Sequence, residues 1–325
     1  MIKINPINIK IWSKLGTCGA LGIAANELAE QDDKVVFLTA DLCNYSGLDR
    51  YSKSHPERFV NLGIAEENLI NVGAGMAKRG FKPFCTTYGT FASMRCADQV
   101  RVSMGYMGLN VKVVGLTSGL SVGILGATHI SCEDISVFRS IPNITILSPA
   151  DSFETIKAVL ASNSIKGPVY IRLTGTLNNP IVYQEDFDYV VGKAIKLIDG
   201  DDIGIIATGT MVHNSIEAAK LLENDGIKCA VFDMHTIKPL DTEAIDLLKN
   251  KKMIVSVEEH SIFGGLGSSI AEYIASKEGF PPLIIIGLED RYPHAASYEH
   301  LIKEYGLNSE NIYCKILSEF ERRFK

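Results

Sequence analysis

The segment Phe59-Val-Asn-Leu-Gly-Ile-Ala-Glu-Glu-Asn-Leu-Ile-Asn-Val-Gly-Ala-Gly-Met-Ala-Lys-Arg-Gly80 determines how the rest of the chain is interpreted. Its first four residues form a short apolar run, which predicts a strand that stops at Gly63. A helix then begins with Glu66 and Glu67 in its first turn, where negative charge suits the positive end of the helix dipole. Taken alone, Glu66 therefore has the ordinary interpretation of a helix-terminal acid. Two glycines inside this helix, Gly73 and Gly75, predict that another backbone packs closely against it.

Strand-like apolar runs and helical patterns alternate on both sides of this segment. In the first half the predicted strands are 35–38, 59–62, 83–87, 111–116, 144–147 and 169–173, with helical patterns at 21–31, 92–104 and 153–162. A second series of strands follows a polar connection, at 203–207, 230–232, 254–257 and 283–286. Alternation of this kind predicts an α/β fold in which helices cover both faces of a parallel sheet. We place the domain boundary near residue 185, which gives domains of residues 1–185 and 186–325.

Composition excludes several classes of protein. The 325 residues are 46% hydrophobic and 22% charged, which fits a globular protein, and the net charge of −6 offers no basic surface for nucleic acid or an anionic membrane. No stretch approaches the roughly 18 apolar residues of a membrane span, and the N-terminal segment lacks the apolar run of a signal peptide. The seven cysteines are scattered without a C-x-x-C pair, which favours free thiols in a reducing compartment. We expect a cytoplasmic protein.

The segment Gly63-Ile-Ala-Glu-Glu-Asn68 and the small-residue helix after it resemble the thiamine diphosphate family of transketolases, 1-deoxyxylulose-5-phosphate synthases and 2-oxoacid dehydrogenase β subunits. The resemblance continues through Gly126-Ala-Thr-His129 and along nearly the whole chain, but it covers only the later part of a full-length transketolase. It implies a pyrimidine-binding domain over residues 1–185 and a transketolase C-terminal domain over 186–325. It also implies that the second domain supports assembly, so that His235, His260 and His294 have structural roles.

The resemblance assigns the residues that contact the cofactor's aminopyrimidine ring. Glu66 corresponds to the acid that exchanges a proton with the ring and thereby activates the cofactor. Asp41, which by chemistry alone is equally well a turn residue, follows a strand where the family has an acid near the ring. Tyr88 and Phe91, which spacing alone would place in the core, correspond to aromatics that stack on the ring. His129 corresponds to a histidine that stabilises or protonates the substrate oxygen, and we expect Glu66 and His129 to be the catalytic residues.

The cofactor's diphosphate and its Mg²⁺ need a further site, which the family builds from Gly-Asp-Gly followed by Asn. That pattern does not occur in the sequence, so we expect no metal ligand in this chain. The resemblance then implies a split enzyme that uses thiamine diphosphate and Mg²⁺. A separate N-terminal transketolase-type subunit would carry the diphosphate and Mg²⁺ motif, in an α₂β₂ assembly with the active site between subunits.

The expected substrate pocket departs from that of transketolase. An ungapped count puts the family's phosphate-binding arginines and histidine, a serine and a sugar-binding acid at five positions whose residues here are different: Cys18, Tyr45, Thr117, Leu125 and Gly175. Cationic side chains are the ordinary means of holding a phosphate dianion, and Arg172 lies one register away as a partial substitute. We therefore expect two-carbon ketol transfer to or from a substrate other than a common sugar phosphate. A nucleotide-linked sugar, an unphosphorylated keto sugar or a small 2-oxo acid would suit such a pocket.

Two alternatives remain at this stage. A 2-oxoacid dehydrogenase E1 β subunit has similar length and domain order, although the Gly-Ala-Thr-His segment favours the transketolase side. A non-catalytic partner subunit is the other, against which the presence of Glu66, Asp41 and His129 argues.

Overall fold

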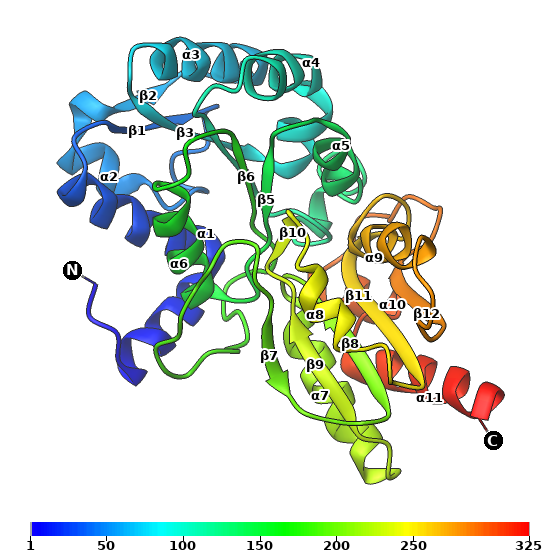
Figure 1. Cartoon of the computed structure of the whole chain (residues 1–325). Helices are drawn as coiled ribbons and strands as arrows, with labels where there is room; N and C mark the ends of the chain where they lie inside the picture. The colour runs from blue at the N-terminus through cyan, green and yellow to red at the C-terminus, as the bar shows by residue number, and fades with distance from the viewer. Residues whose placement is uncertain (1, 325) are drawn as a thin grey trace.

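The computed structural model describes residues 2–324 and contains two α/β units, each built on its own sheet (Figure 1). The first sheet has seven strands in the order β10-β5-β6-β4-β3-β1-β2, and all of its pairings are parallel except that of β10 with β5. Its strands are β1 (Val35–Thr39), β2 (Phe59–Asn61), β3 (Lys82–Tyr88), β4 (Lys112–Leu116), β5 (Thr145–Leu147), β6 (Val169–Arg172) and β10 (Thr236–Lys238). The predicted α/β fold class is confirmed.

Helices cover both faces of this sheet, because its central strands are apolar on both sides. Phe37 of β1 belongs to the apolar cluster beneath α1 (Pro6–Gln31), α2 (Asp49–Ser54) and α6 (Ser152–Ser162). Leu38, its neighbour, belongs to the opposite cluster, which packs against α3 (Glu66–Lys78) and α5 (Asp134–Ser140). The segment η2 (Phe91–Arg95), α4 (Ala97–Gln99) and η3 (Val100–Tyr106) lies on this second face too.

The second sheet has five strands in the order β12-β11-β8-β9-β7, of which only β7 runs antiparallel to its neighbour. Its strands are β7 (Ile195–Ile198), β8 (Ile203–Ala207), β9 (Cys229–Asp233), β11 (Met253–Ser261) and β12 (Leu283–Leu288). Apolar side chains of α7 (Met211–Asn224) and α11 (Ser309–Phe324) pack on one face, and those of α8 (Thr242–Asp246) and α9 (Leu266–Ala275) on the other. The short helix α10 (Tyr298–Glu304) precedes α11.

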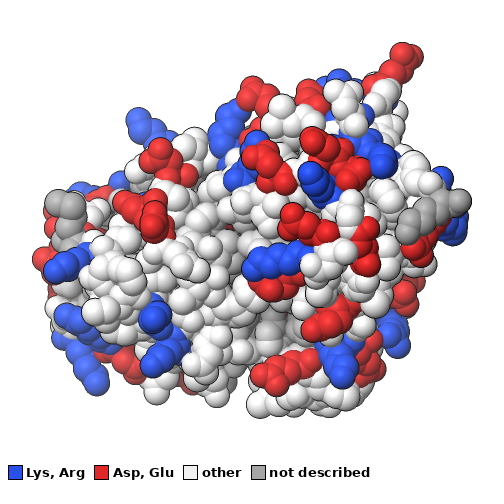
Figure 2. All heavy atoms as spheres, turned by 90° about the horizontal axis from the view of Figure 1, so that it is seen from below, with Lys and Arg blue, Asp and Glu red and all other residues white. Residues whose placement is uncertain are grey.

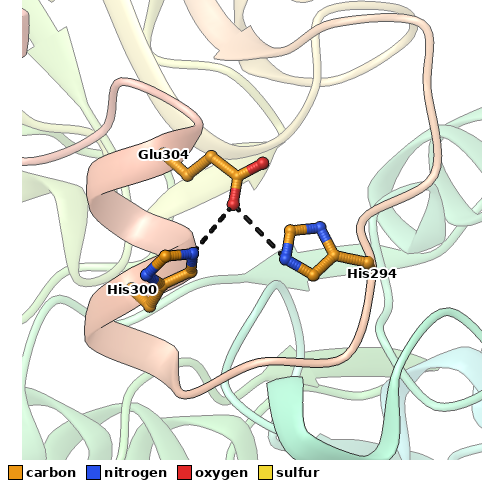
Figure 3. A group of neighbouring side chains, drawn as sticks. All are labelled: His294, His300 and Glu304. Atoms are coloured by element: carbon orange, nitrogen blue, oxygen red, sulfur yellow. Dashed lines mark ion pairs between the residues drawn. The ribbon is translucent and has the colours of Figure 1, made fainter.

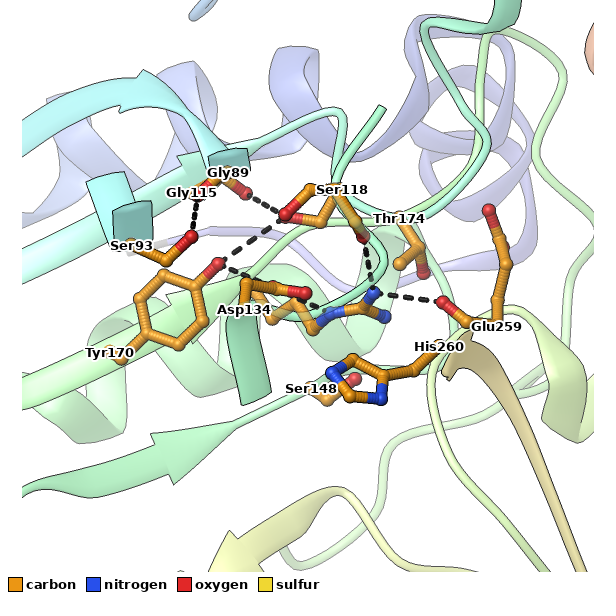
Figure 4. A network of polar contacts seen from close by, with 12 residues as sticks. Gly89, Ser93, Gly115, Ser118, Asp134, Ser148, Tyr170, Thr174, Glu259 and His260 are labelled. Atoms are coloured by element: carbon orange, nitrogen blue, oxygen red, sulfur yellow. Dashed lines mark hydrogen bonds and ion pairs between the residues drawn. The ribbon is translucent and has the colours of Figure 1, made fainter. Parts of the chain in front are cut away.

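A buried polar network fixes the two units against each other (Figure 4). Arg172, at the end of β6, donates through Nε to Asp134 at 2.8 Å and through Nη2 to the backbone oxygen of Glu259 on β11 at 2.8 Å. Tyr170 also donates to Asp134, at 2.6 Å. The Arg172 guanidinium lowers the pKa of Asp134 against the opposing effect of burial, so this carboxylate is charged in the folded protein.

The structure departs from the sequence predictions in its less regular elements. The helix predicted over 92–104 is three consecutive segments with wider turns, and α1 begins well before residue 21 and bends at Gly16, whose φ is 70°. The strands β7 and β10 were not predicted. A side chain at Gly73 would meet the Cys85 sulfur of β3 rather than another backbone, and Gly75 faces open space. The prediction of a closely packed backbone there was wrong.

Charges of both signs alternate over the face seen in Figure 2, without a continuous basic area. All seven cysteines are free thiols. Across residues 2–324 no helix is long and apolar enough to cross a membrane.

Candidate active site at the carboxyl edge of the first sheet

The residues predicted to contact the cofactor come from the carboxyl ends of neighbouring parallel strands. Asp41 follows β1, Glu66 follows β2 as the first residue of α3, and Tyr88 ends β3. The Gly126–His129 turn belongs to the long loop that follows β4. Ligands of open parallel sheets bind at this edge, because successive strand ends and helix N-termini converge there.

Glu66 is buried but does not lie alone. Its residue is only 3% exposed, and its Oε2 accepts an ion pair from Nη1 of Arg95 at 2.7 Å. The Arg95 guanidinium also lies 4.1 Å above the centre of the Phe91 ring. The side chain of Arg95 is 42% exposed, so the cation that covers Glu66 borders solvent.

The aromatic residues and His129 form one cluster of rings. The ring centres of Tyr88 and Phe91 are 5.8 Å apart, and the His129 ring lies 5.5 Å from Tyr88 and 5.2 Å from Phe91, all edge to face. Nδ1 of His129 is 2.9 Å from the hydroxyl of Thr128, its neighbour in sequence. The structure thus brings together the predicted ring-stacking residues and the predicted substrate histidine.

Asp41 is held at the edge by the end of β2. Its backbone amide donates to Oδ1 of Asn61 at 3.1 Å, and Nδ2 of Asn61 donates back to Oδ1 of Asp41 at 3.1 Å. The same Asn61 oxygen accepts from the amide of Gly63, which leads into α3. Asp41 has a φ of 58°, in the left-handed region that is uncommon for residues other than glycine. Such backbone strain concentrates at functional sites.

Three predicted pocket residues gather beside Tyr88. The ring of Tyr45 is 6.2 Å from that of Tyr88, and the Cys18 thiol faces the backbone of Thr117 in a hydrogen bond. Burial raises the pKa of Cys18 to about 11, so it is a neutral thiol at pH 7. Thr117 is also strained, with a φ of 45°, and its buried hydroxyl has no partner among residues 2–324. An unpaired buried hydroxyl is a ready hydrogen-bond partner for a ligand.

The other two pocket positions lie on the adjoining loops. Leu125 is 45% exposed, and its backbone oxygen accepts from the hydroxyl of Thr128, one residue before His129. Gly175 is buried at a φ of 84°, and a Cβ there would come within 2.8 Å of atoms of both Asn179 and Thr210. An arginine therefore has no room at position 175.

The structure contradicts the expectation that Arg172 partly replaces the missing cations. Its side chain is 1% exposed, and its guanidinium is committed to Asp134 and to backbone oxygens of Ser131 and Glu259. Leucine and threonine follow it in sequence, which gave no sign of this burial. Arg95 is instead the arginine at the cofactor residues.

The C-terminal domain supports the loop that carries His129. Oε1 of Glu259 accepts from the amide of Leu120 at 2.5 Å, and Oε2 accepts from the hydroxyls of Thr210 and Tyr298. His235 and His260 are buried, and desolvation lowers the pKa of each to about 4, which agrees with structural roles. His294 does not match that expectation, because its side chain is 55% exposed and faces Glu304.

Sequence reasoning missed two residues of the site, Arg95 and Asn61. The contact of Arg95 with Glu66 joins residues from different helices, which no local pattern reveals. Its position four residues after Phe91 was the available signal, because residues at that spacing share a helix face. Asn61 is a polar residue in an otherwise apolar run just before a glycine, which is typical of a strand end that faces a ligand edge.

The site fits the ring half of thiamine diphosphate. A buried carboxylate lies next to the aromatic rings of Tyr88 and Phe91, and the unpaired hydroxyl of Thr117 is at the same edge. A planar, polar heterocycle needs a stacking surface and a proton partner at its rim, and these groups provide both. A site for the diphosphate and its cation is not part of this cluster.

Comparisons with known proteins agree with this arrangement. Residues 13–179 match the transketolase pyrimidine-binding domain, and residues 192–312 match the transketolase C-terminal domain. One of the two subunits of the apulose-4-phosphate transketolase of Phocaeicola vulgatus is 40% identical over 91% of this chain and 95% of its own length. The 6-deoxy-6-sulfo-D-fructose transketolase subunit of a Clostridium species is 40% identical over 88% of this chain and 88% of its own length.

Among solved structures, a split-gene transketolase described as an inactive β4 tetramer is 35% identical, with a TM-score of 0.87 over 95% of this chain and 99% of that one. These relatives favour transketolase over the 2-oxoacid dehydrogenase alternative. The match extends over both domains, in the order in which the two sheets occur here. The buried acid, the ring cluster and both domains therefore have one common origin, and the chain belongs to the transketolase family.

Proposed function

We propose that this chain is the C-terminal subunit of a split, thiamine diphosphate-dependent transketolase-like transferase that moves a two-carbon ketol unit. The observation that carries the proposal is the buried Glu66 carboxylate beside the ring cluster of Tyr88, Phe91 and His129. The similar subunits named for two different transketolase reactions support it. We retain residues 1–185 and 186–325 as the domain boundaries and the cytoplasm as the location, for which the seven free thiols speak.

In the proposed enzyme this chain binds the aminopyrimidine ring. Glu66 exchanges a proton with the ring nitrogen at its rim, Tyr88 and Phe91 stack on the ring and exclude water, and Asp41 lines the edge beside them. The cofactor supplies a nucleophilic carbon that attacks a ketone. His129, whose ring faces the same cluster, donates a hydrogen bond or a proton to the substrate oxygen.

The diphosphate and Mg²⁺ belong, in this proposal, to an N-terminal transketolase-type subunit in an α₂β₂ assembly. The similar β4 tetramer described as inactive is consistent with a chain of this kind needing a partner. It also fits the open face of the site, where Ile64 is 79% and Tyr45 65% exposed.

The substrate, we propose, is not a common pentose or hexose phosphate. Cys18, Tyr45 and Thr117 present a neutral thiol, a phenol and a hydroxyl to the pocket, and Leu125 and Gly175 add no charge. The two relatives are named for reactions of an apulose phosphate and of a sulfonated fructose, so similar subunits serve unusual sugars.

Calorimetric titration of thiamine diphosphate with Mg²⁺ tests the proposal. This chain alone, the N-terminal subunit alone and their mixture are titrated in parallel. Binding confined to the mixture, followed by ketol transfer between unphosphorylated or sulfonated sugars, is expected. Tight binding to this chain alone would place the diphosphate site here and overturn the split-site proposal. Efficient turnover of xylulose 5-phosphate with ribose 5-phosphate would overturn the substrate proposal.

A further inference from the structure

Three side chains outside the cofactor site converge on one point of the C-terminal domain (Figure 3). Nε2 of His294 lies 3.4 Å from Oε2 of Glu304, and Nε2 of His300 lies 3.1 Å from the same oxygen. His300 and Glu304 are one helical turn apart on α10, and His294 comes from the loop before it. The two imidazole rings are inclined at 71° to each other, so both aim their nitrogens at the carboxylate from different directions.

We propose that His294, His300 and Glu304 form a binding site for a divalent transition-metal ion, with Zn²⁺ as the best match. Ligands bound tetrahedrally at roughly 2.0–2.1 Å are about 3.4 Å apart, and both nitrogen-to-oxygen separations are already close to that value. The three ligand atoms all lie within 4.8 Å of one another, so small side-chain rotations close the set. Two imidazoles and a carboxylate suit Zn²⁺, whereas Mg²⁺ prefers oxygen ligands. This site is therefore distinct in chemistry from the Mg²⁺ site of the cofactor.

The position of the site connects it with the loop that carries His129. The amide of Ala296 donates to the backbone oxygen of Gly123 at 3.2 Å, and Ala295 lies 3.3 Å from where a Cβ on Gly126 would be. A bound ion joins the 294–296 segment to α10 and so holds the surface on which residues 123–126 rest. All three ligand side chains are partly exposed, which leaves one coordination position for water.

Titration of the metal-free full-length chain with ZnCl₂ tests the site. Wild type is compared with His300→Ala, His294→Ala and Glu304→Gln, all in a Cys314→Ser background, because Cys314 is an exposed thiol that also binds zinc. Glu299→Gln is the control, an exposed acid on α10 outside the group. We expect each ligand variant to bind Zn²⁺ at least about 10-fold more weakly and the control to bind as wild type does.

Cobalt supplies a second readout that does not depend on folding stability. Co²⁺ bound by two histidines and a carboxylate shows visible absorption of a tetrahedral ion without a sulfur charge-transfer band in the near ultraviolet. A sulfur band, equal Zn²⁺ affinity in His300→Ala and wild type, or no binding at micromolar Zn²⁺ would each overturn the proposal. The last result would leave the group as ion pairs of protonated histidines with Glu304.

A second inference comes from the independent contacts of Arg95, and it rests on the proposed function. Its planar guanidinium lies 4.1 Å over the Phe91 ring and donates to Glu66 at 2.7 Å. An aminopyrimidine ring bound here would make the same two contacts, stacking on the aromatic and hydrogen bonding to the acid. We infer that Arg95 occupies the place of the cofactor ring in the free chain and is displaced when the ring binds.

Displacement makes cofactor binding weaker than it would be without Arg95. An ion pair and a cation–π contact at a partly exposed site must be broken first, and the population ready to bind is reduced accordingly. The half-exposed side chain can leave toward solvent without disturbing the core. Arg95→Met, which keeps the length and removes the charge, is therefore expected to bind the cofactor about 3- to 10-fold more tightly.

The measurement is the dissociation constant of thiamine diphosphate for the mixture of both subunits. Arg101→Met is the control, an exposed arginine two turns along that pairs with Asp98 and should change nothing. Unchanged or weaker binding by Arg95→Met, with normal binding by wild type, would overturn the displacement inference alone. Failure of the wild-type mixture to bind would overturn the proposed function itself.

Discussion

The molecule contains two acid–arginine pairs of nearly the same length and opposite character. Glu66 and Arg95 are 2.7 Å apart at the carboxyl edge of the first sheet, and Asp134 and Arg172 are 2.8 Å apart at the junction of the two units. The Arg95 side chain is 42% exposed, whereas that of Arg172 is 1% exposed and donates to further backbone oxygens. The first pair can open toward a ligand and the second cannot. The difference shows that the surroundings of a charged pair, more than its length, decide whether it can serve binding or structure.

The largest effect should come from removing the acid of the exchangeable pair. Glu66→Gln keeps the shape of the side chain but cannot exchange a proton with the cofactor ring. We expect ketol transfer by the mixed subunits to fall by about 10²- to 10⁴-fold, with little change in the unfolding midpoint. Glu67→Gln, on the exposed side of the same first turn, should retain full activity. A variant at Glu66 with more than a third of wild-type turnover would remove this acid from the mechanism.

The buried pair should respond in stability rather than in chemistry. Arg172→Met leaves Asp134 charged and uncompensated inside the protein, which we expect to lower the free energy of unfolding by about 3–5 kcal/mol in urea. Adding Asp134→Leu removes the orphaned charge and should recover most of the loss. A single variant as stable as wild type would show that the pair is not structural.

A third test uses the buried carboxyl of Asp233, which accepts from Tyr183 at 2.6 Å. Burial raises the pKa of Asp233 to about 7 from 3.8. Because the folded protein keeps this proton longer than the unfolded chain does, the resulting stabilisation is full below about pH 4. It is lost as the pH rises toward 7, by up to about 1.4 kcal/mol per pH unit.

Asp233→Asn cannot titrate, so its stability should fall less steeply between pH 4 and 7 when urea unfolding is followed across that range. Asp225→Asn is the matched control, an exposed aspartate that also accepts from a tyrosine, Tyr313 at 2.8 Å. Parallel pH profiles for Asp233→Asn and wild type would show that this carboxyl does not carry the pH dependence.

The smallest effect should come from the hydrogen bonds that hold Asp41 beside the movable pair. Asn61→Ala removes two bonds between the ends of β1 and β2, each worth about 0.5–1.5 kcal/mol. Binding of thiamine diphosphate to the mixed subunits should weaken by about 2- to 10-fold, as measured by calorimetry. Asn68→Ala, on the exposed side of α3, should bind as wild type does.

The sequence predicted the regular parts of the fold well, because burial on both faces leaves continuous apolar runs. Residues 203–207 were predicted as a strand and form β8 with those bounds. The strands β7 and β10 escaped notice, since each has only three or four residues and β7 is only partly buried. The helix over 92–104 was predicted with regular turns, but packing under the ring cluster imposes wider ones.

The site was predicted as a set of residues, and the structure adds how they meet. Tyr88, Phe91 and His129 contact one another because three strand ends converge, which spacing along the chain does not reveal. The exchange of roles between Arg172 and Arg95 has the same cause. One arginine lies on a central strand and is enclosed by the second domain, and the other faces outward from a helix.

The strand β10 has a consequence for how the molecule can be divided. Although it follows β9 of the second sheet, its residues 236–238 complete the first sheet by pairing with β5. A cut between the two units would leave β5 with a row of open backbone groups, which invites edge-to-edge aggregation. Gene fission can therefore separate this pair of units from other subunits, but a break near residue 185 should yield two insoluble fragments rather than two working proteins.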